Sequence, residues 1–209
     1  MALYHAEKNS AVLPAPEGCA FVLLYTGPDA ISMTGLQSGL CQNLTFIVDH
    51  EIGHLVTAYG MPRHASRTLH ECSADAYAAL RQLQRFENGM QGVEKLRLRR
   101  AQRLVSLEGM RHATHFTSFT LEKLIELAPH LPLGQLSAQQ TAELAARIAI
   151  VHTPNDQIVK NVVDAFAPFR TALAAQPGDD TPYRILAQTV TETKEWEVFK
   201  WGAPVLRGY

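Results

Sequence analysis

The chain has 209 residues, 46% of them hydrophobic, and a formal net charge of -1, which fits a packed soluble protein and excludes a broadly basic or acidic partner-binding surface. We expect no nucleic-acid partner, because the net charge is close to zero. We expect no membrane partner either, because no apolar run is long enough to cross a bilayer, and the polar first ten residues lack the apolar core of a secretory signal. Three cysteines without CxxC spacing favour a reducing, cytoplasmic location, although secretion without a signal peptide would leave the same sequence.

The predicted elements begin with a β-hairpin and continue as helices. Strand-forming residues at 21–25 and 30–34 flank the turn residues 27–29 and predict the hairpin. Apolar residues at helical spacing predict helices over residues 44–59, 68–86, 93–109, 120–127, from 137 onward and over 155–175. A linker at 177–180 precedes a tail whose weak alternation over 185–198 predicts one or two strands.

These elements predict an α+β fold in which the hairpin packs on the helices at 44–59 and 68–86. We divide the chain into a core at 1–89, a helical region at 90–176 that forms the other wall of a cleft, and a linker and tail at 177–209. The three parts are expected to form one compact unit. One predicted helix is strongly basic and is interpreted as a solvated face; its cations are Lys95, Arg97, Arg99, Arg100 and Arg103.

The segment His50-Glu51-Ile52-Gly53-His54 carries the pattern HExxH inside the first predicted helix. Residues four apart share one face of a helix, so both imidazoles can reach one metal ion. Glu51 lies beside that face, where its carboxylate can take a proton from a metal-bound water. Two buried, unpaired imidazoles would be costly to desolvate, and a metal removes that cost. The pattern predicts zinc ligands at His50 and His54.

A catalytic zinc needs a third protein ligand and one position open to water. Four residues are candidates for the third ligand: His64, His70, Glu71 and Asp75. A metzincin arrangement needs histidine at the sixth position after His54, and Gly60 stands there. Glu71 is favoured because Glu71 and Asp75 are four apart and can aim both carboxylates at the HExxH helix. Glu71 would bind zinc, and Asp75 would accept a hydrogen bond from the outer nitrogen of a ligand histidine.

HExxH followed by ExxxD on the next helix resembles the gluzincin clan of zinc peptidases. The segment Glu71 to Leu80 is also similar to the second motif helix of small cytoplasmic gluzincins, the ImmA/IrrE type and the HtpX-like peptidases. The resemblance covers about residues 20–86. It implies a zincin-like core with zinc ligands at His50, His54 and Glu71, with Glu51 as general base and acid, and with Asp75 as the partner of His50.

Many gluzincins use a His or Tyr to stabilise the tetrahedral oxyanion, and no position here matches that pattern. His112 and His115 are the predicted donors. The alternative is that both are surface histidines at a helix end. Tyr59 and Tyr77 are further candidates, each alternatively a core or rim residue.

Together these features predict a zinc metalloendopeptidase that hydrolyses a protein or peptide substrate through a zinc-bound water activated by Glu51. The hairpin edge is expected to hold the substrate as an added strand. Two alternatives stay open. One is a non-catalytic, zinc-binding regulatory protein of the same fold, and the other is a zinc amidohydrolase acting on a non-peptide amide.

Overall fold

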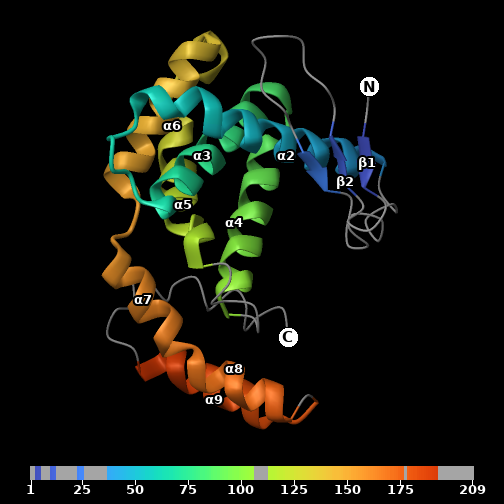
Figure 1. Ribbon diagram of the computed structural model, residues 1–209, viewed down its shortest axis with the longest axis vertical. Coiled ribbons are helices and arrows are strands. Elements are labelled where there is room, and N and C mark those ends of the chain that lie inside the picture. The colour runs from blue at the N-terminus through green and yellow to red at the C-terminus, as the bar shows by residue number, and fades with distance from the viewer. Residues whose placement is uncertain are drawn as a thin grey trace.

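The computed structural model describes residues 3–5, 10–12, 23–25, 37–105, 113–176 and 178–192. The α-helices of this part are α2 (Gln37–Thr57), α3 (Arg67–Arg85), α4 (Gly89–Val105), α5 (Ser118–Leu127), α6 (Ala138–His152), α7 (Asp156–Ala165), α8 (Ala167–Ala175) and α9 (Thr181–Glu192) (Figure 1). Short 3-10 turns occur at η2 (Ala58–Gly60), η3 (Ala113–His115), η4 (Ala128–His130) and η5 (Leu133–Gln135). Within the described ranges, no helix is both long and apolar enough to cross a lipid bilayer.

The predicted α+β fold is wrong, because the described part of the chain is a helical assembly. Three short strands, β1 (Leu3–His5), β2 (Ser10–Val12) and β3 (Leu23–Tyr25), pair antiparallel in the order β1-β2-β3. β3 falls in the strand predicted at 21–25, but it pairs with β2, and residues 30–34 lie outside the described part. The strands' substantial contacts are with one another, whereas helices surround α3. Within the described residues, the two motif helices therefore pack mainly on other helices and not on a hairpin.

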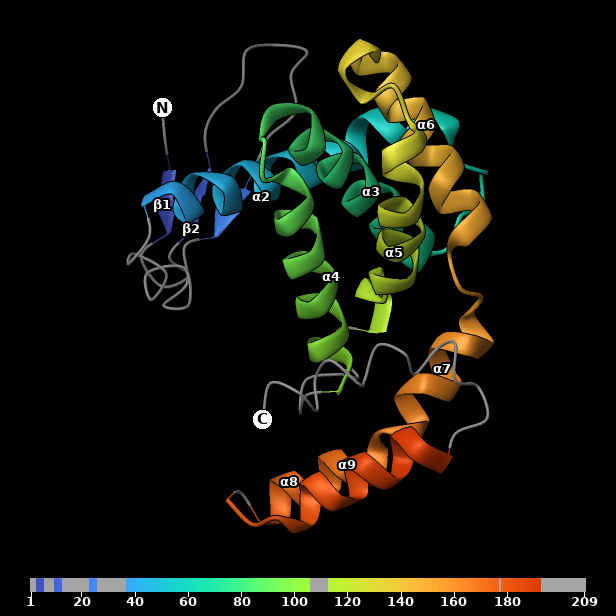
Figure 2. The ribbon, with the colours of Figure 1, turned by 180° about the vertical axis from the view of Figure 1, so that it is seen from behind.

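The helix α3 is the centre of this assembly (Figures 1 and 2). Every residue from Glu71 to Leu80 is buried, and the helix packs against α2, α4, α5 and α6. Most side chains in this stretch are small, which lets neighbouring helices approach closely. The apolar core around α3 includes Val93, Leu121, Leu124 and Ile148. Helix-on-helix packing therefore buries the Glu-bearing helix on all sides.

Polar side chains and a proline mark the ends of several helices. The helix predicted from 137 onward is α6, and it begins with a capping box in which Ser137 and Gln140 each accept a hydrogen bond from the other's backbone N–H. Ser66 caps α3 by accepting a hydrogen bond from Leu69 N at 3.1 Å. The predicted helix at 155–175 is divided at Phe166 into α7 and α8, with Pro168 in the first turn of α8.

The helices α7, α8 and α9 extend away from the rest of the assembly (Figures 1 and 2). The strand prediction for the tail is wrong over residues 185–192, which belong to α9, while 193–198 lie outside the described part. These helices share a small apolar core with Phe116, a residue of the connection between η3 and α5. Phe116 thereby attaches the C-terminal helices to the segment that follows η3.

The two motif helices touch at Gly53 of α2. A Cβ atom added at Gly53 would lie 2.8 Å from Cα and 2.9 Å from the carbonyl oxygen of Ala74 on α3. One helical turn before Gly53, the buried Asp49 carboxylate accepts a hydrogen bond from Nη1 of Arg85. These contacts fix the crossing of α2 over α3, and that crossing places the HExxH residues opposite Glu71 and Asp75.

The close crossing predicts that Gly53→Ala lowers the free energy of unfolding by about 1–3 kcal/mol, because backbone atoms of Ala74 cannot move aside as a flexible side chain would. Gly92→Ala is the matched control in α4, where the nearest neighbour is Gln82 Oε1 at 4.0 Å. We expect this control to be neutral or to stabilise by up to about 1 kcal/mol. Urea unfolding of both variants measures the difference, and equal stabilities would contradict the close crossing.

Candidate metal centre

Three side chains of α2 and α3 bring donor atoms together at the crossing. Nε2 of His50 lies 3.2 Å from Nε2 of His54, and Oε2 of Glu71 lies 3.4 Å and 3.7 Å from these two nitrogens, respectively. Zinc with ligands at about 2.0–2.1 Å in tetrahedral geometry separates its ligand atoms by about 3.3–3.4 Å. The three donors thus stand where three corners of a zinc tetrahedron would be.

The burial of Glu71 gives an independent test of whether a cation fits. Within the described residues, Oε2 of Glu71 is a buried atom without a hydrogen-bond partner. It nevertheless lies within 3.7 Å of the imidazoles of His50 and His54, and 3.2 Å from Nε2 of His115. Burying a carboxylate oxygen that receives no hydrogen bond costs free energy. A cation bound between the two imidazoles and this carboxylate would offset that cost. The donor set, two imidazoles and a carboxylate, suits zinc.

Asp75 holds the outer nitrogen of the first histidine. Nδ1 of His50 lies 2.7 Å from Oδ1 of Asp75, four residues beyond Glu71 on the same face of α3. A carboxylate accepts only, so Nδ1 carries a hydrogen, and Nε2 is the nitrogen that faces Glu71 and His54 and offers its lone pair once it has lost its proton. The arrangement agrees with the role predicted for Asp75, and it prepares His50 to act as a ligand.

Two residues that the sequence analysis did not assign to the site also bind Asp75. Nε and Nη2 of Arg100 donate to Oδ2 and Oδ1 of Asp75 at 2.8 Å and 2.7 Å, and the hydroxyl of Thr117 donates to Oδ2. The solvated-face interpretation is wrong for Arg100, which is only 9% exposed. The burial of Arg100 could have been inferred from its spacing. Arg100 stands seven residues after the buried Val93 and therefore lies on the same face of the helix.

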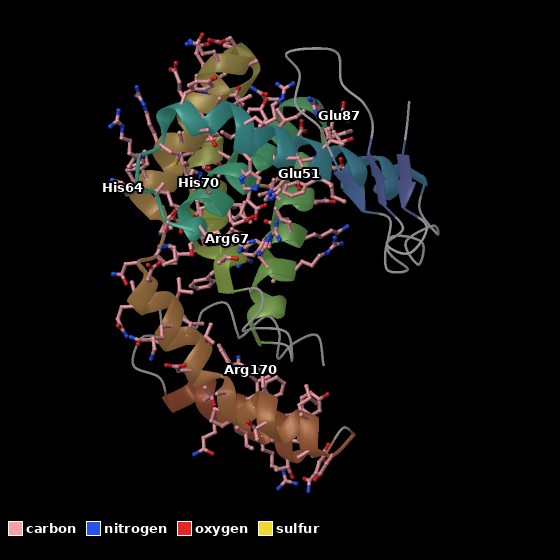
Figure 3. All side chains as sticks on the ribbon, viewed as in Figure 1. Glu51, His64, Arg67, His70, Glu87 and Arg170 are labelled. Atoms are coloured by element: carbon pink, nitrogen blue, oxygen red, sulfur yellow. The ribbon has the colours of Figure 1, made fainter. Side chains whose placement is uncertain are left out.

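Glu51 and His115 lie at the solvent side of the donor group. Glu51 is half-buried on α2 (Figure 3). Within the described part of the chain, its carboxylate takes part in no hydrogen bond or salt bridge. His115 on η3 is 26% exposed and approaches Glu71 from outside α2 and α3. His112 lies outside the described residues.

The other sequence candidates do not join the donor group. Its members, with donor atoms within 4.8 Å of one another, are His50, His54 and Glu71. His64 is exposed on the connection between α2 and α3, away from Glu51, and His70 stands beside Glu71 without entering the group (Figure 3). Tyr77 belongs to the apolar core, and Tyr59 is 99% exposed. The structure therefore favours Glu71 over the histidines as the third donor.

Burial and neighbouring charges set the protonation of the donors. Burial alone would lower the pKa of His50, but the hydrogen bond to Asp75 and the nearby carboxylate of Glu71 raise that pKa to about 9. Burial and the adjacent His50 lower the pKa of His54. Burial acts to raise the pKa of Glu71, yet the imidazoles of His50, His115 and His54 hold it below its ordinary value. In the metal-free protein at neutral pH, a proton on His50 takes part of the role that a cation would have.

Comparison with protein-family models, with curated proteins and with solved structures finds no match. The gluzincin resemblance therefore remains a prediction that depends on HExxH and the ExxxD segment. The candidate centre is supported by its geometry alone.

The geometry predicts that Glu71→Ala lowers zinc affinity more than any other single change in α3, because it removes the only carboxylate in the donor group. Asp75→Ala should weaken zinc binding by about 10- to 100-fold, since it removes only the partner of His50. Competition with a chromophoric chelator measures both affinities. Retained zinc in Glu71→Ala together with an empty site in Asp75→Ala would reverse the assignment.

The raised pKa of His50, about 9, predicts a pH dependence of zinc binding. Zinc needs the neutral imidazole, so below pH 9 the metal must displace one proton from His50. We expect apparent affinity to rise about tenfold per pH unit from pH 7 to 8.5, with about one proton released per zinc bound. Calorimetry in buffers of different ionisation enthalpy counts that proton. Affinity that stays constant over this interval would contradict the protonation assigned to His50.

Proposed function

We propose that this protein is a zinc metalloendopeptidase that hydrolyses peptide bonds of a protein or peptide substrate. The observation that carries the proposal is the spacing of the His50, His54 and Glu71 donor atoms, with the uncommitted carboxylate of Glu51 next to His50 on the same helix. The site is also accessible, because the His54 side chain is 30% exposed. An accessible donor set beside an unpaired carboxylate supports hydrolysis rather than mere structural metal binding.

Each residue has a separate task in this mechanism. Zinc held by the three donors would polarise the substrate carbonyl and lower the pKa of a coordinated water. Glu51 would accept a proton from the attacking water as its oxygen bonds to the carbonyl carbon, and would deliver that proton to the amine nitrogen as the C–N bond breaks. His50 stays oriented through its hydrogen bond to Asp75. His115, which reaches the group from η3, donates its N–H to the carbonyl oxygen as negative charge develops there.

The position of His115 also favours one competing function. Its Nε2 is 3.2 Å from Oε2 of Glu71, so a shift of His115 toward His50 and His54 would make it a fourth zinc ligand. A site with four protein ligands has no position for water and would be structural. The protein would then be a regulatory or binding protein. The predicted strand addition of substrate at a hairpin edge is wrong for the described part of the chain, where helices surround the donor group.

We further propose a cytoplasmic setting, which the unpaired thiol of Cys72 fits. That thiol is buried and donates toward the carbonyl of Phe116. Burial raises its pKa to about 11, so Cys72 is not a nucleophile.

Glu51→Gln tests the proposed function, because the amide keeps the shape of the side chain but cannot accept the proton. We expect peptide hydrolysis to fall by at least about 100-fold while one zinc per chain is retained. Hydrolysis of an unbiased peptide pool, followed by mass spectrometry, is the measurement, and His64→Gln on the exposed connection is the matched control. Equal cleavage by the wild type and Glu51→Gln, or a zinc-loaded wild type that cleaves no peptide, would contradict the proposal.

A further inference from the structure

The carboxylate of Asp75 is saturated with hydrogen bonds inside the protein. It is fully buried and receives one bond from His50, two from Arg100 and one from Thr117. A carboxylate has about four acceptor sites, so these donors occupy all of them. The donors come from α2, α4 and the segment after η3, while Asp75 belongs to α3. The orientation of this carboxylate is therefore set by several parts of the fold together.

Arg100 supplies the contact that fixes the plane of the Asp75 carboxylate. Its Nε and Nη2 atoms bind both oxygens side by side, a fork that only a guanidinium offers. The hydroxyl of Thr117 and the imidazole of His50 each bind a single oxygen. Without the fork, the carboxylate could rotate, and the Nδ1 partner of His50 would lose its direction. Within the described residues, the hydrogen bonds and ion pair of Arg100 go to Asp75 and not to the donor group.

We propose that Arg100 is a positioning residue of the metal site, which fixes the Asp75 carboxylate and through it the metal-binding face of His50. The inference rests on the proposed zinc site and deepens it, because it names the residue that makes the His50 donor rigid. Arg100 also cancels the charge of Asp75, so that Glu71 is the carboxylate whose charge remains for the metal. A zinc ion there would keep a net positive charge and stay an effective Lewis acid.

The test compares metal binding in Arg100→Lys and Arg100→Met with the control Arg99→Met, which removes the same charge at the exposed neighbouring position. We measure zinc affinity by chelator competition and the ligand field by the visible absorption of the cobalt-substituted protein. Arg100→Met should bind zinc about 10- to 100-fold more weakly, and Arg100→Lys about 10-fold more weakly, both with altered cobalt spectra. Arg99→Met should match the wild type in both measurements.

A double variant shows whether Arg100 acts through Asp75. Asp75→Asn removes the charge and one acceptor, so adding Arg100→Lys to it should cause little further loss of zinc affinity. Losses that multiply would overturn the proposal, as would wild-type affinity and spectrum in Arg100→Lys. Loss of the helical circular-dichroism signal in both Arg100 variants would also overturn it, because Arg100 would then be a folding residue. Absence of peptidase activity in the zinc-loaded wild type would contradict the proposed function and leave this metal-binding result standing.

Discussion

The buried carboxylate of Asp75 is the point on which the candidate centre depends. Burial acts to raise the pKa of Asp75, but the guanidinium of Arg100 and the imidazole of His50 hold that pKa well below its usual range. The side chain is therefore a permanent anion, and an unpaired anion at this depth would be strongly destabilising. Helices α2 and α4, together with the segment after η3, must each present a donor to it. The same requirement brings the HExxH histidines to Glu71.

The close crossing of α2 over α3 and the saturated carboxylate serve different purposes. Contact at Gly53 and Ala74 sets the distance between the helices, while the hydrogen bonds of Asp75 set the orientation of the donors. Close packing at backbone level leaves little freedom for the helices to slide. His50 and His54 then face the buried Oε2 of Glu71, an acceptor without a hydrogen in the described part of the chain. A divalent cation is the simplest group that completes this arrangement.

Local sequence patterns were sufficient to identify the donor residues on α2 and α3. The four-residue spacings of His50 with His54, and of Glu71 with Asp75, fix which side chains share a face, and these relations hold in the structure. Arg100 reaches the site from a third helix, and only tertiary packing decides which side of α4 is buried. The prediction of an α+β fold was wrong for a similar reason. Residues 23–25 do form a strand, but strand pairing joins distant segments of the chain. In the described part, the packing partners of the motif helices are other helices.

Zinc K-edge X-ray absorption of the protein loaded with one equivalent of zinc tests the central claim most directly. The account predicts four light-atom ligands at about 2.0–2.1 Å, of which two are imidazoles, one is a carboxylate and one is water. Such a spectrum would come from His50, His54 and Glu71 with one open position. A spectrum with three imidazoles would place His115 in the fourth position and close the site. That result, or failure to retain zinc, would contradict a catalytic centre.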